Sequence, residues 1–270
     1  MLNLMWGKMK KRNWLWAINR RLRNYGFQVD RFPKTGLLTE LISEIQRVVS
    51  HLTPEEKVEL AFLFDGVSAS LRGGGEMNSQ LGQDVWVLGQ LRNNASNNSS
   101  FTYLEIGAYD PIMWSNVELL RKVLKARGLS VDPNPEVTEK FAQKGLQEDF
   151  LEVAVGPFSG QVEFIEEGAL SYVKHTPNTK SLATGVRMVT PEELLKSVSN
   201  IDYLSLDIEG GELEVLELWP WETHAPKLIT VEHNNRESDK DLILNILIKN
   251  GYREVLASIT EFESWFCRNV

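Results

Sequence analysis

Residues 101–116 read FTYLEIGAYDPIMWSN, and this stretch decides the fold. Its first half is a short apolar run rich in strand-forming residues, namely Phe101, Tyr103, Leu104 and Ile106. Gly107 follows at once, and Ser115 can cap a helix whose apolar positions recur at helical spacing. A strand that enters a helix through a glycine turn opens a nucleotide-binding βαβ unit, in which glycine lets the backbone approach a ligand.

A second landmark, VDPNPE, follows the next predicted strand. Asp132 lies 25 residues after Gly107, at the offset where an acidic side chain accepts hydrogen bonds from a ribose diol. The turn after the first strand reads Gly107-Ala108-Tyr109-Asp110-Pro111, so the GxGxxG pattern of dinucleotide sites is absent. A ligand that has a ribose but no phosphate fits better, and S-adenosylmethionine is the obvious one.

Four motifs in order carry a family resemblance: SQLGQD (79–84), EIGAYDP followed by SN (105–116), VDPNP (131–135) and IDYLSLDIEGGELEVLE (201–217). Together they resemble the FkbM family of S-adenosylmethionine-dependent O-methyltransferases, from about Ser79 to the C-terminus. One departure is Asp110-Pro111, where many members have Asp-Gly. Proline has no N–H, so the turn cannot donate a hydrogen bond at that position.

The resemblance implies a Rossmann-like class I methyltransferase fold, α/β, with a mostly parallel seven-stranded sheet and helices on both faces. It also implies that Gln80 faces the cofactor pocket. The cofactor contacts expected on this basis are Gln83, Asp84, Glu105, Gly107, Ala108, Asn116, Asp132, Asn134 and Val155. For Gln80, Gln83 and Asp84, a capped helix with solvated amides remains an equal alternative.

The alternation of strand and helix patterns leads to the same architecture without the family. Ligands of such sheets bind beyond the carboxyl ends of the strands. Glu105, Asp132, Asp207 and Glu232 all stand at predicted strand ends, so we expect them to converge.

Methyl transfer to a hydroxyl needs alignment of the reacting atoms and a group that takes the proton. His233 is the expected general base, because imidazole titrates near neutrality. Asp207, Glu209 and Glu232 complete the expected catalytic set. These three carboxylates could instead hold Mg²⁺. Alternatively, Asp207 and Glu209 could simply cap the following helix and accept backbone N–H bonds.

The composition narrows the class of protein. The chain has 270 residues, 42% of them hydrophobic, and no apolar stretch long enough to span a bilayer. Its net charge is −8, which argues against nucleic acid as a partner. A single cysteine, Cys267, excludes an internal disulfide, and we expect a cytoplasmic protein, with the inner face of the membrane as a further location.

Residues 1–75 are expected to form an accessory helical region, and 76–270 the methyltransferase domain. Residues 1–29 hold seven Lys or Arg and no acid, and five aromatic residues lie among 1–27. This pattern fits a peripheral membrane contact, an arm packed on its own domain, or a homodimer contact.

The function expected from the resemblance is O-methylation of a hydroxyl on a small molecule or glycan, meaning a sugar, a glycan or a secondary metabolite. One alternative is a non-catalytic methyltransferase-like module tethered to a membrane surface, for which Pro111 is the favourable feature. Another is an NAD-dependent Rossmann enzyme, which would have to explain the missing glycines.

Overall fold

A computed structural model describes residues 49–94, 101–165, 171–174, 185–234, 236–258, 260 and 262–269. The basic segment 1–27 lies outside these ranges, as do residues 166–170 and 175–184. Backbone contacts divide the chain into two units, Met1–Ala61 and Phe62–Val270. The domain boundary expected at residue 75 stays a prediction. None of the helices in the described ranges combines the length and the apolar character that a bilayer crossing requires.

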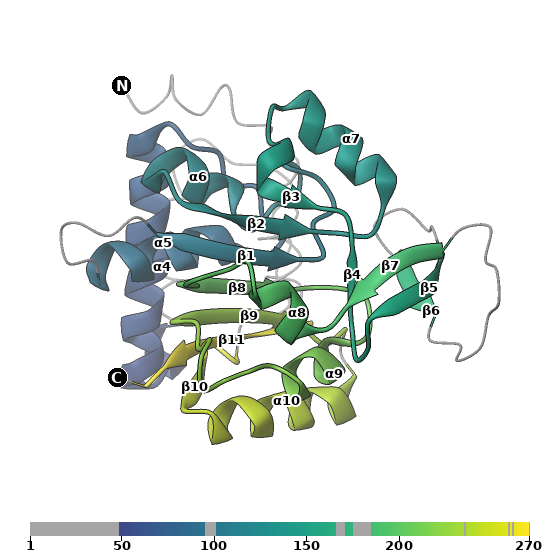
Figure 1. The fold of residues 1–270 in the computed structure, drawn as a ribbon. Helices are drawn as coiled ribbons and strands as arrows, with labels where there is room; N and C mark the ends of the chain where they lie inside the picture. Colours follow the sequence, from purple (N-terminus) through teal and green to yellow (C-terminus); the bar gives the residue numbers. More distant parts are fainter. Residues whose placement is uncertain are drawn as a thin grey trace, which may run out of the picture. The chain divides into compact units, whose positions relative to one another are not determined.

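A seven-stranded sheet forms the centre of the larger unit (Figure 1). Its strands are β1 (Thr102–Ile106), β2 (Arg127–Val131), β3 (Phe150–Leu151), β8 (Tyr203–Leu206), β9 (Leu228–Glu232), β10 (Tyr252–Val255) and β11 (Glu263–Arg268). They lie in the order β10-β11-β9-β8-β1-β2-β3, and only β11 runs antiparallel to its neighbours. The mostly parallel seven-stranded sheet is therefore confirmed.

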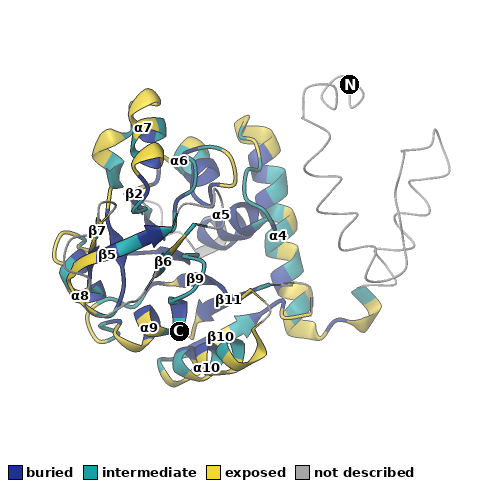
Figure 2. Cartoon of the chain, turned by 90° about the vertical axis from the view of Figure 1, so that its right-hand side faces the viewer, coloured by how far each residue is buried: buried dark blue, intermediate teal, exposed yellow. Residues whose placement is uncertain are grey.

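Helices cover both faces of this sheet. One face packs on α8 (Pro191–Leu195), α9 (Glu212–Glu217) and α10 (Glu237–Lys249). The other packs on α5 (Gln83–Asn94), α6 (Glu118–Leu124) and the C-terminal part of α4 (Pro54–Gly73). Figure 2 shows that the strands are largely buried, whereas the outer sides of α7 (Pro135–Gln143) and α10 are exposed.

The strands alternate between the two cores because successive side chains of a strand point to opposite faces. Leu104 and Ile106 of β1 lie in the core with α9 and α10, whereas Tyr103 lies in the core with α5 and α6. Burial of β1 on both faces explains why apolar residues occupy adjacent positions of this strand.

A second sheet of four strands stands beside the first, in the order β4-β7-β5-β6. Its strands are β4 (Ala154–Val155), β5 (Gly160–Ile165), β6 (Tyr172–Lys174) and β7 (Gly185–Val189). Residues 150–155 do not form one strand but are divided between the two sheets. The chain pairs β3 with β2, leaves the main sheet at Glu152-Val153, and pairs β4 with β7.

Candidate active site

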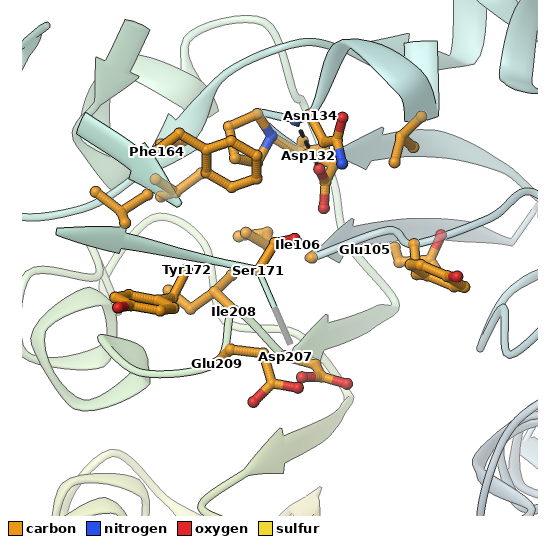
Figure 3. A pocket seen from close by; sticks show the side chains of 18 of the residues that line it. Glu105, Ile106, Asp132, Asn134, Phe164, Ser171, Tyr172, Asp207, Ile208 and Glu209 are labelled. Atoms are coloured by element: carbon orange, nitrogen blue, oxygen red, sulfur yellow. Dashed lines mark hydrogen bonds between the residues drawn. The ribbon is translucent and has the colours of Figure 1, made fainter. Parts of the chain in front are cut away.

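A cleft opens at the carboxyl ends of β1, β2 and β8 and reaches the small sheet (Figure 3). It encloses about 980 Å³ of space, part of it open to solvent. Most of the predicted site residues line it, namely Gln80, Glu105, Gly107, Asn116, Asp132, Asn134, Val155, Asp207 and Glu209. The expected convergence of strand ends is present, because parallel strands end at one edge of the sheet.

Gly107 is fixed by a close approach between two strand ends. Its φ is +93°, and a Cβ built there would lie 1.5 Å from the carbonyl oxygen of Asp207. Its N–H donates to the carbonyl oxygen of Val131 at 2.8 Å. The glycine therefore lets the turn after β1 pass the end of β8.

Glu105 is buried at the centre of a polar network beneath the cleft. One carboxylate oxygen accepts from the Ser130 hydroxyl at 2.7 Å, and the other from the Asn116 backbone N–H at 3.0 Å. Burial raises the pKa of Glu105, and the nearby Arg121 charge opposes that shift. These bonds join β1, β2 and the segment before α6, so Glu105 shapes the cleft as well as lining it.

Asn116 offers the cleft an acceptor. Its side-chain NH₂ donates to the Ser205 hydroxyl at 2.9 Å, whereas its Oδ1 is buried and has no hydrogen-bond partner among the described residues. A buried acceptor without a donor is costly, and a bound N–H or ammonium group would satisfy it.

Asp132 follows β2 and stands where a ribose diol was predicted. The backbone N–H of Asn134 donates to its carboxylate at 2.8 Å. Burial raises the pKa of Asp132 to about 7, and the charges of Glu105 and Asp207 add to the rise. Asn134 also caps α7 by accepting from the Glu136 N–H. Apolar side chains complete this end of the cleft: Val137, Val153, Val155 and Phe164.

Three carboxylates gather beyond β8 and β9. Oxygens of Asp207, Glu209 and Glu232 all lie within 4.8 Å of one another. Asp207 and Glu232 hydrogen-bond each other, so the pair holds a proton between them. Burial, this bond and the Asp207 charge raise the pKa of Glu232 to about 11. The Asn234 side-chain NH₂ donates to both Glu209 and Glu232 at 3.1 Å.

Glu212 stabilises the turn that carries Glu209 through hydrogen bonds to its backbone. It was not among the predicted site residues. Glu209 has a φ of 59°, and Gly210 and Gly211 each have 119°. One Glu212 oxygen accepts from the N–H groups of Ile208 and Gly210, at 3.1 and 2.9 Å. The other accepts from Arg236 at 3.2 Å. The signal in the sequence was an acidic residue directly after Gly-Gly at a helix start.

Five predicted site residues do not line the cleft in the part of the chain that the structure describes: Gln83, Asp84, Ala108, Glu232 and His233. Gln83 donates to Glu263 at 2.8 Å, and Asp84 accepts from the Ser79 hydroxyl and the Asn78 N–H. Ala108 packs on Val137 and Phe141.

His233, the expected base, is 1% exposed and lies outside the lining, and burial lowers the pKa of its imidazole. Its role as a base stays a prediction.

Aromatic side chains form a wall of the cleft, and Trp114 is one of them. The cleft is also lined by Tyr109, Phe164 and Tyr172. Phe164 and Tyr172 belong to the second sheet, whose formation the sequence did not reveal.

Comparison with known proteins gives a family match over the site. Residues 105–254 match the model of the family described as Methyltransferase FkbM domain. No curated protein matches the chain.

Two solved structures among those similar to this chain are methyltransferases. One is methyltransferase FkbM from Methylobacillus flagellatus, with 13% identity over 76% of this chain, a TM-score of 0.42, and 59% of that protein's length spanned. The other is the O-methyltransferase TomG from Streptomyces achromogenes in complex with S-adenosylmethionine. Its identity is 9% and its TM-score 0.39, and the match covers 81% of this chain and 100% of TomG.

Proposed function

The chain belongs to the FkbM family of S-adenosylmethionine-dependent methyltransferases, and we propose that it methylates a hydroxyl oxygen of a sugar, glycan or secondary metabolite. The observation that carries this proposal is the cleft itself. A carboxylate placed for a ribose, Asp132, and carboxylates placed to take a proton, Asp207 and Glu209, line one small-molecule site.

The residues present fit the cofactor. Asp132 would hold the ribose diol, the unpartnered Oδ1 of Asn116 would accept from the ammonium group, and the apolar end at Val153 and Val155 would take the adenine. When bound, the cofactor would supply a methyl group from a positively charged sulfur, and that sulfur would keep the electrons of the broken carbon–sulfur bond and become a neutral thioether. The acidic lining of the cleft favours that positive charge.

Asp207 is the group that we assign to the hydroxyl proton. It lines the cleft, whereas Glu232 lies behind it and shares a proton with it. Burial raises the pKa of Asp207, so the pair can accept a second proton more readily than an ordinary carboxylate. As the hydroxyl oxygen bonds the methyl carbon, its proton passes to this pair and later to water.

The same three carboxylates support a second candidate, a divalent cation such as Mg²⁺. Oxygens at this spacing suit a hard cation, which would replace the proton shared by Asp207 and Glu232 and acidify the acceptor hydroxyl. Activity lost in EDTA and restored by Mg²⁺ would support the cation. Unchanged activity in EDTA would exclude the cation and support Asp207 and Glu232 as the proton acceptor.

Calorimetric titration with S-adenosylhomocysteine, with NAD in parallel, tests the proposal first. We expect micromolar binding of S-adenosylhomocysteine and none of NAD. Labelled methyl transfer to hydroxylated compounds, with the product's O–CH₃ group identified by NMR, tests the acceptor atom. Asp207→Asn should lower kcat at least tenfold with an unchanged dissociation constant for S-adenosylhomocysteine. Binding of NAD alone, or of neither ligand, would overturn the proposal.

A further inference from the structure

The cleft is strongly one-sided in charge. Glu105, Asp132, Asp207 and Glu209 line it, and within the described ranges no Lys, Arg or His side chain does. S-adenosylmethionine, with two cationic groups and one carboxylate, offsets only part of this charge. An acceptor that brought a phosphate or carboxylate would therefore place its negative charge beside these carboxyl groups, and no basic side chain of the described lining would receive it.

Trp114 presents an aromatic face at the same cleft. It lines the cleft, yet it is 38% exposed, and its ring stacks on Tyr109 with ring centres 5.4 Å apart and planes tilted by 27°. Tyr172, on the second sheet, also lines the cleft and is 38% exposed. Large exposed aromatic rings within a cleft provide flat apolar surface for a ligand to cover.

The loop that carries Trp114 is built to hold this position. Trp114 has a φ of 64°, a conformation that a bulky side chain rarely adopts and that the surroundings must enforce. Asp110 accepts from the N–H groups of Ile112 and Met113, both at 2.9 Å.

Two basic residues brace the loop further. Arg121 donates to the carbonyl oxygen of Pro111, and Lys140 donates to the carbonyl oxygen of Tyr109 with its Nζ 4.2 Å from the centre of the Tyr109 ring. Such a loop offers its indole without an ordering cost on binding.

We propose that the acceptor is a ring-bearing molecule without a negative charge, and that its ring stacks on Trp114. The inference rests on the proposed methyl transfer and narrows its substrate class. Neutral and amino-bearing rings are admitted, and phosphorylated, nucleotide-linked and carboxylated acceptors are excluded. Stacking fixes the plane of the ring, and the carboxylates are left to accept hydrogen bonds from its hydroxyl or ammonium groups.

Saturation-transfer NMR on protein saturated with S-adenosylhomocysteine tests the inference. The probes are methyl glucoside, methyl mannoside, methyl rhamnoside, glucosamine and tyramine, beside glucose 6-phosphate and UDP-glucose. We expect saturation transfer to at least one neutral or cationic ring and none to the two phosphates. Trp114→Ala should weaken that binding about tenfold, Trp114→Phe should retain most of it, and Met113→Ala, a neighbouring exposed residue outside the lining, should change nothing.

Three results would overturn the inference: preference for a phosphate, no binding by any neutral or cationic ring, or unchanged binding in Trp114→Ala. Loss of S-adenosylhomocysteine binding itself would instead contradict the proposed function, and the initial calorimetric titration detects it separately.

Discussion

Asp132, which we assign to cofactor binding, lowers the stability of the free protein at neutral and higher pH. Its pKa of about 7 lies well above the usual value of about 3.9, because burial disfavours its charge. Between those two pH values the folded protein keeps a proton that the unfolded chain has released. Stability therefore falls as the pH rises through this window, and it stays lowered above it.

We expect Asp132→Asn to stabilise the free protein and to weaken cofactor binding. At pH 8 the gain in the free energy of unfolding is at most about 4 kcal/mol, and it shrinks as the pH approaches 4. Affinity for S-adenosylhomocysteine should fall more than tenfold. Urea unfolding at several pH values and calorimetry measure the two effects, with the exposed Asp241→Asn on α10 as the control. A variant that is no more stable at pH 8, or that binds as before, contradicts this assignment.

At the scale of elements, the junction between β8 and α9 decides where Glu209 points. Glu212 is 1% exposed and ties the Ile208 and Gly210 N–H groups to the start of α9, and Arg236 secures it from α10. Glu212 itself does not line the cleft, so it is a positioning residue.

We expect Glu212→Ala to lower kcat at least tenfold while the dissociation constant for S-adenosylhomocysteine changes little, because the misplaced group is Glu209 rather than a cofactor contact. Glu212→Gln keeps an oxygen that can accept both N–H groups, so it should recover most of the rate. Steady-state kinetics separate kcat from KM. Glu217→Ala, an exposed change on the same helix, is the control. Equal losses in the Ala and Gln variants would argue against positioning.

The strands and helices differ in how well the sequence predicts them and the site residues that they carry. Alternation of strands and helices was enough to predict the main sheet and the convergence of Glu105, Asp132 and Asp207 at its edge. His233 was expected in the cleft but does not line it. It follows Glu232 directly, and neighbouring residues of an extended chain point to opposite sides, so a motif alone does not show which of the two faces the cleft. The break between β3 and β4 has no glycine or proline to mark it, since pairing with the distant β7 decides it.

At the scale of the molecule, the lining of the cleft comes from both sheets, and every lining residue belongs to Phe62–Val270. Binding should therefore stabilise this unit through strands that are far apart in sequence. S-adenosylhomocysteine at a hundred times its dissociation constant should add about 2.7 kcal/mol to the free energy of unfolding.

For a unit of this size we expect Tm to rise by roughly 5 to 10 °C. Differential scanning calorimetry measures the shift, and NAD at the same concentration is the control. An equal shift with NAD, or none with S-adenosylhomocysteine at a saturation verified by titration, contradicts this expectation.

The contact between Gly107 and the carbonyl oxygen of Asp207 also bears on how distant chains are aligned. A substitution at position 107 would force two backbone segments apart, so a related chain that keeps both segments can hardly vary there. Where two related chains share few identical residues, most columns of their alignment carry little information. Gly107 and Asp207 give two alignment columns, 100 positions apart in this chain, whose residues are in direct backbone contact. Matching both columns together constrains how the residues between them are aligned.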